Sequence, residues 1–273
     1  MPRQVTAVEG RMVGLRYRSR VALQPSDFTI ERGTVAALIG PNGSGKSTVL
    51  NAVAGLHTPD VGSLTVFGRP PVESRSHIAY VLQSTRVNEA LPVTVREVVA
   101  MGRYASLGMV GRFSPGDRTA VERAMEQTEV TDLATSQLAE LSGGQRQRVF
   151  VAQGLAQDRD LLLLDEPLTG LDLVSMEVII GVVRGERAAG RTVIMTTHDL
   201  GDASQADHVI LLAGRVVAQG SPDEVLTAER LSDAYAHRMV TMEGRVMVDD
   251  PAHQPTDRRH VHLDRSKGGA ART

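Results

Sequence analysis

The 273-residue sequence contains no cysteine and no long apolar run. Without cysteine the chain forms neither disulfides nor a thiolate metal site. A helix that crosses a membrane needs about 18 or more consecutive apolar residues, whereas the strongest apolar run here, 161–164, stops at two acidic residues. The N-terminal residues also lack the apolar stretch of a secretory signal. We therefore expect a chain that resides in the cytoplasm.

The sequence also has no large excess of charge of one sign, and it contains almost no lysine. The formal net charge of −2 provides no general attraction for nucleic acid or anionic lipid, so we expect no nucleic-acid partner. Of the 30 basic residues only Lys46 and Lys267 are lysines. A chain that uses arginine almost everywhere has kept lysine at position 46, within the glycine-rich segment considered below.

Alternating strand-like and helix-like segments predict an α/β fold with a mostly parallel sheet. Residues 34–39 form an apolar run between Gly33 and Gly40, which is typical of a buried strand, and helical spacing follows over 46–56. Helix and strand continue to alternate from 144 to 196, which favours a sheet covered by helices. The short strands of the N-terminal part are expected to form an antiparallel β subdomain.

Two further segments lack buried-strand runs. Residues 93–140 are predicted to form an inserted helical subdomain, whose first helix begins with Thr94 and Glu97 spaced as a capping box. The main domain is assigned to 1–248. Residues 249–273 are polar and are predicted to be a flexible tail. The histidines at 253, 260 and 262 leave open a metal-sensing role for this tail, although a solvated terminus is the simpler interpretation.

A glycine-rich loop follows the predicted strand at 34–39. Residues 40–47 match the P-loop pattern in its strand–loop–helix context, which disfavours a simple turn without a ligand. Glycines let the backbone approach phosphates, and the helix N-terminus adds about half a positive charge. Lys46 is expected to reach the β- and γ-phosphates, Ser47 to bind Mg²⁺ and Thr48 to reach the α-phosphate. The predicted nucleotide-binding residues of the loop are Gly40, Pro41, Asn42, Gly43, Ser44, Gly45, Lys46, Ser47 and Thr48.

Two acidic residues follow the apolar run at 161–164. Ligands of open α/β sheets bind at the carboxyl ends of the strands. Asp165 is therefore expected to hold Mg²⁺ through its water shell, and Glu166 to orient and polarise the attacking water. An acidic pair that merely begins a solvated loop is the alternative, and the P-loop in the same sheet disfavours it.

The remaining motifs, in their order along the chain, resemble those of ABC ATPases. Segment 141–145, Leu-Ser-Gly-Gly-Gln, matches the signature sequence of that family. The other matching residues are Tyr17 for the aromatic that stacks on adenine, Gln83 for the Q-loop, Ser142, Gly143, Gly144 and Gln145 for the signature, Asp172 for the D-loop and His198 for the switch histidine. Taken alone, each of these residues has an ordinary structural interpretation, so the ordered set carries the resemblance.

The resemblance implies a P-loop NTPase core that uses ATP and Mg²⁺. It makes Lys46, Glu166 and His198 the catalytic residues, and Ser47, Gln83 and Asp165 the residues around Mg²⁺. It also implies a head-to-tail homodimer, in which each ATP lies between the P-loop of one subunit and the signature of the other, with Asp172 contacting the opposite subunit. The helical subdomain and the loop of Gln83 would grip transmembrane permease subunits, so the chain would be peripheral at the cytoplasmic face of the membrane.

Two segments, 91–104 and 148–152, resemble the ATPases of zinc and manganese importers. This implies a divalent metal ion as cargo and an extracytoplasmic substrate-binding protein as a further partner. ATPases of iron-siderophore and cobalamin importers share a Gly-Arg pair, as at 102–103, and the segment 167–172. These cargoes, and an exporter, therefore stay open, as does a less favoured non-transport ABC ATPase. None of these residues would touch the cargo, so the predicted cargo rests only on similarity to other ATPases.

Overall fold

The computed structural model describes residues 5–83, 92–107, 111–235, 239–242 and 245–248. Contacts divide the chain into two units, Met1–Tyr235 and Ala236–Thr273, which are described separately. The second unit contains an antiparallel hairpin of β10 (Met239–Met242) and β11 (Arg245–Val248). The tail predicted at 249–273, with its histidines, lies outside the described residues, so the boundary at 248 stays a prediction.

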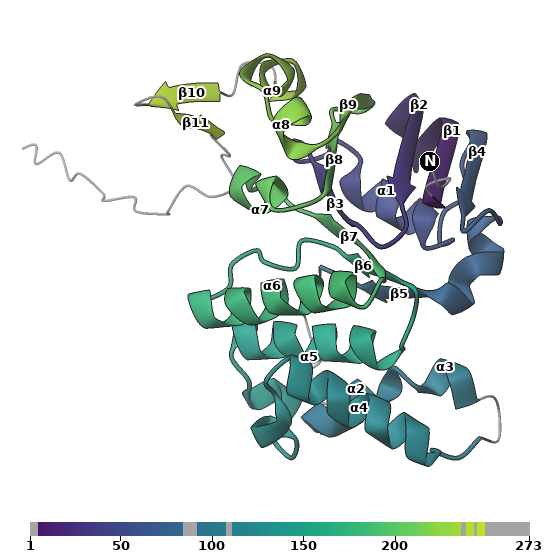
Figure 1. The fold of residues 1–273 in the computed structure, drawn as a ribbon, viewed down its shortest axis with the longest axis vertical. Coiled ribbons are helices and arrows are strands. Elements are labelled where there is room, and N and C mark those ends of the chain that lie inside the picture. The colour runs from purple at the N-terminus through teal and green to yellow at the C-terminus, as the bar shows by residue number, and fades with distance from the viewer. Residues whose placement is uncertain (1–4, 84–91, 108–110, 236–238, 243–244, 249–273) are drawn as a thin grey trace, which may run out of the picture. The chain divides into compact units, whose positions relative to one another are not determined.

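A six-stranded sheet forms the centre of the first unit (Figure 1). Its strands, in spatial order, are β5 (Ile78–Val81), β6 (Leu161–Leu164), β7 (Thr192–Thr196), β3 (Val35–Ile39), β8 (His208–Leu212) and β9 (Val216–Gly220). The first five strands are parallel, and β9 pairs antiparallel with β8 through the turn at Gly214. Strands β3, β6 and β7 are buried throughout, as expected for parallel strands covered on both faces.

The N-terminal strands form a second, antiparallel sheet, as predicted. It consists of β2 (Arg20–Glu31), β1 (Thr6–Tyr17) and β4 (Val61–Val66) in that order. Helix α1 (Lys46–Val53) buries Val49, Leu50 and Val53 in a core that it shares with both sheets. The first turn of α1, which follows the glycine-rich loop, is thereby fixed against two layers of strands.

Helices cover the other face of the central sheet. Leu161 and Leu163 of β6 belong to the core that contains α1, whereas Leu162 lies beside Gly154 of α5, because side chains alternate along a strand. The remaining helices are η1 (Pro71–His77), α2 (Val95–Met101), α3 (Tyr104–Leu107), α4 (Pro115–Gln127), η2 (Thr131–Leu133), η3 (Leu138–Glu140), α5 (Gly143–Ala156), α6 (Leu173–Ala188), α7 (Leu200–Ser204), α8 (Pro222–Val225) and α9 (Ala228–Tyr235). Among the described residues, none of the helices is long and apolar enough to cross a bilayer.

The segment predicted to be helical, 93–140, contains α2, α3 and α4, and α2 and α4 pack on α5 (Figure 1). The capping box predicted at its start is present, because the Glu97 N–H donates to Thr94 Oγ1 (3.4 Å) and the Thr94 N–H to Glu97 Oε2 (2.7 Å). These features, with the two sheets, confirm the predicted fold class: a mostly parallel core, an antiparallel β subdomain and an inserted helical subdomain.

Two arginines, Arg103 and the buried Arg148, tie this helical subdomain to α5. Arg103 Nε donates to Asp117 Oδ1 (2.8 Å), and its Nη1 donates to the carbonyl of Ala156 at the end of α5 (3.0 Å). Arg148 Nη1 of α5 donates in turn to the carbonyl of Glu129 (2.8 Å). Each guanidinium donates to a carbonyl at or just after a helix C-terminus, where the last carbonyls of a helix have no intrahelical N–H partner, so the subdomain is held by hydrogen bonds as well as by packing.

Candidate functional site

The glycine-rich loop lies between β3 and α1, at the carboxyl end of the central strand. Gly40, Gly43 and Gly45 have φ of 148°, 81° and 105°, a region that side chains disfavour. A Cβ at Gly40 would collide with the Leu212 carbonyl, and one at Gly45 would collide with the Ala22 carbonyl. The loop therefore needs glycine for its conformation and for the close approach of the neighbouring strands.

Two side chains of this loop are buried with their polar atoms. Lys46 is 5% exposed, and its Nζ donates to the carbonyls of Gly40 (2.8 Å) and Pro41 (3.4 Å). Ser44 Oγ is buried and, within the described part of the chain, makes no hydrogen bond. A buried hydroxyl without a partner is costly, and a bound phosphate would satisfy it. The loop thus fits an anionic ligand in its residues as well as in its backbone.

The Ser47 and Asp165 side chains meet, as their predicted shared role requires. Ser47 Oγ donates to Asp165 Oδ1 (3.2 Å), and Thr196 Oγ1 at the end of β7 donates to the same oxygen (2.7 Å). Hydroxyl and carboxylate oxygens are the ligands that Mg²⁺ prefers, with the remaining positions filled by water and phosphate. The residues present therefore fit Mg²⁺. Thr196 was not among the site residues predicted from the sequence. The signal that could have indicated it is a polar residue at the end of the apolar strand 192–196.

Glu166 is held in a strained backbone conformation next to this pair. Its φ is +48°, which is uncommon for a residue with a side chain. Its N–H donates to Thr196 Oγ1 (2.8 Å), while its Oε2 accepts from Gln83 Nε2 (2.7 Å) and Thr169 Oγ1 (3.4 Å). Gln83, from the end of β5, thus reaches the predicted base, which sequence reasoning alone did not pair with it. Its contact with Mg²⁺ stays a prediction.

The predicted signature and D-loop residues lie against each other within one subunit. Ser142 caps α5 through a reciprocal pair with Gln145, at 3.0 and 3.2 Å. A Cβ on Gly144 would collide with Asp172 Oδ2 and Ser175 Oγ. Asp172 caps α6 by accepting from the Ser175 N–H and hydroxyl, both at 2.9 Å, and these bonds lower its pKa. Gly143, in contrast, has open space on its side-chain face.

The two remaining predicted residues lie at the ends of strands. Tyr17 ends β1, is 57% exposed and has the Arg18 guanidinium 5.6 Å from its ring centre. Its exposed ring is available for stacking on a planar ligand. His198 follows β7 and is half-buried, directly before Asp199, which caps α7. The roles of both residues stay predictions.

The fold and these motifs define the class of protein, and comparison with known proteins agrees. Residues 23–169 match the family described as ABC transporter. The chain therefore belongs to the ABC transporter family, in which it corresponds to the ATP-binding subunit.

Individual relatives match most of the chain. It is 38% identical to the zinc transport system ATP-binding protein TroB of Treponema pallidum, over 85% of this chain and 88% of that protein. It is 35% identical to the manganese transport system ATP-binding protein MntB of Listeria innocua, over 85% and 97%. A dimeric structure of the ATP-binding cassette MJ0796 with ADP and Pi has a TM-score of 0.70 and 27% identity, over 79% of this chain and 98% of that one.

Proposed function

We propose that this chain binds ATP with Mg²⁺, hydrolyses it, and thereby powers the import of a divalent metal ion, zinc or manganese. The observation that carries the hydrolytic part is the convergence of three side chains and the backbone of Glu166 at one sheet edge. The side chains of Ser47, Asp165 and Thr196 are joined there by hydrogen bonds, and Thr196 also accepts from the Glu166 N–H, directly beside the loop of Lys46. Phosphoryl transfer needs positioning and charge more than covalent chemistry, and this arrangement can supply both.

In this proposal Lys46 and the loop bind the phosphates. The Lys46 ammonium donates to neutral carbonyls, and a phosphate oxygen is a stronger acceptor because it is charged. ATP binding would therefore replace those carbonyls, while backbone N–H groups at the start of α1 hold further phosphate oxygens. Mg²⁺, when bound, would neutralise phosphate charge, held by Ser47, Asp165 and Gln83.

Glu166 would accept the proton of the attacking water and orient that water in line with the γ-phosphate. Its carboxylate accepts from Gln83 and Thr169, so both side chains can set its direction. The Thr196 hydroxyl binds both the backbone N–H of Glu166 and one oxygen of Asp165, which fixes the positions of the base and the metal ligand relative to each other. His198 would hold the γ-phosphate from the end of β7.

A second subunit would complete each ATP site. The sequence has one P-loop and one signature, and the open face of Gly143 leaves room for a ligand that approaches α5 from outside the subunit. MJ0796, a relative of the same fold, is described as dimeric in its post-hydrolysis state. We therefore infer a homodimer that acts on transmembrane permease subunits at the cytoplasmic face of the membrane.

The proposed cargo rests on relatives. TroB is named for zinc transport and MntB for manganese transport, and segments 91–104 and 148–152 resemble such ATPases. A substrate-binding protein outside the membrane would be a further partner. Residues of this chain would act on the permease and not on the metal, so cargo must be tested in cells.

Replacement of Glu166 by Gln tests the hydrolytic role. The amide keeps the hydrogen-bonding size but cannot take the proton, so we expect ATP to bind with unchanged affinity while turnover falls about a hundredfold or more. Glu177→Gln, on the exposed face of α6, changes the charge equally and should hydrolyse ATP as the wild type does. Undiminished turnover in Glu166→Gln would exclude this residue as the base.

Elemental analysis of cells grown under metal limitation tests the cargo. Cells that carry Glu166→Gln should contain less zinc or manganese than cells with the wild-type chain, and other metals should be unchanged. Normal zinc and manganese would contradict the cargo while leaving the ATPase assignment in place, and would favour a chelated iron or cobalamin-like substrate, or export.

A further inference from the structure

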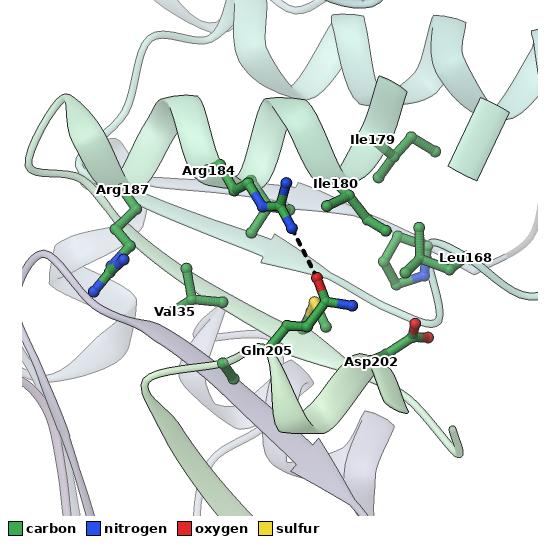
Figure 2. A pocket seen from close by; sticks show the side chains of 12 residues that line it. Val35, Leu168, Ile179, Ile180, Arg184, Arg187, Asp202 and Gln205 are labelled. Atoms are coloured by element: carbon green, nitrogen blue, oxygen red, sulfur yellow. Dashed lines mark hydrogen bonds between the residues drawn. The ribbon is translucent and has the colours of Figure 1, made fainter. Parts of the chain in front are cut away.

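A pocket lies on the helical side of the central sheet, away from the glycine-rich loop. It has a volume of about 310 Å³ and is bounded by α6, α7 and the strands β3 and β7 (Figure 2). Its floor is apolar and includes Leu168, Ile179, Val183 and Met195, all buried. None of the residues that line it belongs to the predicted nucleotide-binding set.

The rim of this pocket carries an arginine whose charge is not neutralised by an acid among its hydrogen-bond partners in the described chain. Arg184 Nη2 donates to Gln205 Oε1 (2.9 Å), a neutral amide. The neighbouring Arg187 instead pairs with Asp207. A guanidinium has five N–H donors in a planar fork that matches a carboxylate. Arg184 therefore has donors left for an anion at the mouth of an apolar cavity.

The end of the pocket opposite Arg184 contains an acidic residue, Asp202, and therefore disfavours an anion. Figure 2 shows Asp202 near Leu168, with Gln205 between it and Arg184. Asp202 Oδ2 accepts from the Thr197 hydroxyl (3.2 Å). A carboxylate placed there would be repelled by an ionised Asp202. A ligand with one anionic group would therefore be oriented, with its charge at Arg184 and its apolar part towards Leu168.

The size of the pocket limits the ligand. A cavity of about 150 Å³ accommodates benzene, and ligand pockets start at about 300 Å³. The space here is thus suited to one or two rings or a medium-length acyl chain. We propose that this pocket binds a small organic carboxylate with an apolar body, its carboxylate on Arg184 and its apolar part on the floor between α6 and β7.

Occupancy would bear on hydrolysis through covalent neighbours. Leu168 is two residues after Glu166, and Met195 directly precedes Thr196, which bonds both Glu166 and Asp165. A bound ligand would stiffen this wall and oppose movements of Glu166. It would lower the turnover of ATP without occupying the ATP site. This rate effect rests on the proposed function, whereas the binding itself does not.

Calorimetric titration of the full chain with 4-phenylbutanoate, and with its neutral amide as comparison, tests the binding. We expect saturable one-to-one binding of the acid and about tenfold weaker binding of the amide, because an ionic hydrogen bond on a partly exposed arginine is lost. No saturable binding of the acid up to about 1 mM would overturn the site. Equal affinity for acid and amide would overturn the ligand class.

Two variants locate the binding. Arg184→Gln should reduce affinity for the acid to that of the amide, whereas Arg118→Gln, on the exposed face of α4, makes the same charge change and should alter nothing. Ile180→Trp should fill the cavity and abolish binding of both compounds, with retention of the fold checked by ATP binding. Unaltered affinity of the acid in Arg184→Gln would contradict the proposed orientation.

The rate effect is measured on the same protein. Saturating 4-phenylbutanoate should lower kcat for ATP with unchanged KM, and the concentration that gives half of this effect should be about tenfold higher for Arg184→Gln. Binding without any change in kcat would overturn the regulatory part. Absence of ATP hydrolysis in the untreated wild type would overturn the proposed function instead, and the calorimetric result would stand by itself.

Discussion

At the scale of single residues, Thr196 connects the parts of the candidate site. One hydroxyl donates to Asp165 and accepts from the backbone of Glu166, which has a positive φ. Strain of this kind persists only where the surroundings enforce it. The positions of both acidic side chains thus depend on a third side chain from a different strand.

Replacement of Thr196 by Val tests this dependence. The methyl group keeps the volume but removes both hydrogen bonds, so we expect the free energy of unfolding to fall by about 1–3 kcal/mol and turnover to fall at least tenfold. Thr192→Val, on the same strand, removes the hydrogen bond that Thr192 Oγ1 accepts from the Gly33 N–H and should lower stability without lowering turnover per folded subunit. If both variants hydrolyse ATP equally well, Thr196 has a structural role alone.

At the scale of secondary-structure elements, the sequence was informative where one local rule dominated. The apolar run at 161–164 was predicted to be a buried strand and is one, and Thr94 with Glu97 formed the predicted cap. The order of the strands in the sheet and the contacts between side chains could not be predicted from local rules, because they depend on packing between segments that are distant in the sequence. The hydrogen bond of Gln83 to Glu166 joins the ends of two strands, and only the parallel register of β5 and β6 brings them together.

One strand carries a group that should make stability depend on pH. His208 begins β8, and burial lowers its pKa below 6.5, although Glu31, Gln219 and Glu224 act in the opposite direction. The unfolded chain then binds more protons than the folded chain just below pH 6.5, so stability is lost as pH falls from 6.5 towards the lower, folded-state pKa. Urea unfolding at pH 7.5, 6.5 and 5.5 should show this loss, and His208→Gln should lose less. An equal loss in both proteins would place its origin elsewhere.

At the scale of the whole molecule, an exposed apolar pair provides a test of the proposed homodimer. Leu173 and Val174 are 77% and 61% exposed at the start of α6, directly after Asp172. Exposed apolar residues in contiguous positions are typical of interfaces. In the proposed homodimer the D-loop faces the other subunit, so these side chains would be buried there.

Replacement of Leu173 by Glu tests the interface. The side chain is exposed in the single subunit, so stability should change by no more than about 0.5 kcal/mol. A carboxylate buried on association is unfavourable, and we expect ATP-dependent dimerisation of the Glu166→Gln protein to weaken at least tenfold in sedimentation experiments. Leu56→Glu, at a position before β4 that is 62% exposed, should dimerise normally. Undisturbed dimerisation of the Leu173 variant would place the interface elsewhere.

The close packing of Gly144 against Asp172 and Ser175 has a consequence for how the two ATP sites of a dimer would influence each other. The signature residue and the D-loop residue share one tightly packed corner, with no room for a methyl group between them. In a head-to-tail dimer, each of these motifs serves the partner, so a shift that improves the fit to one is transmitted to the other. Thermodynamic linkage is reciprocal. The dimer would therefore respond to its second ATP differently from its first, although the two sites are chemically identical.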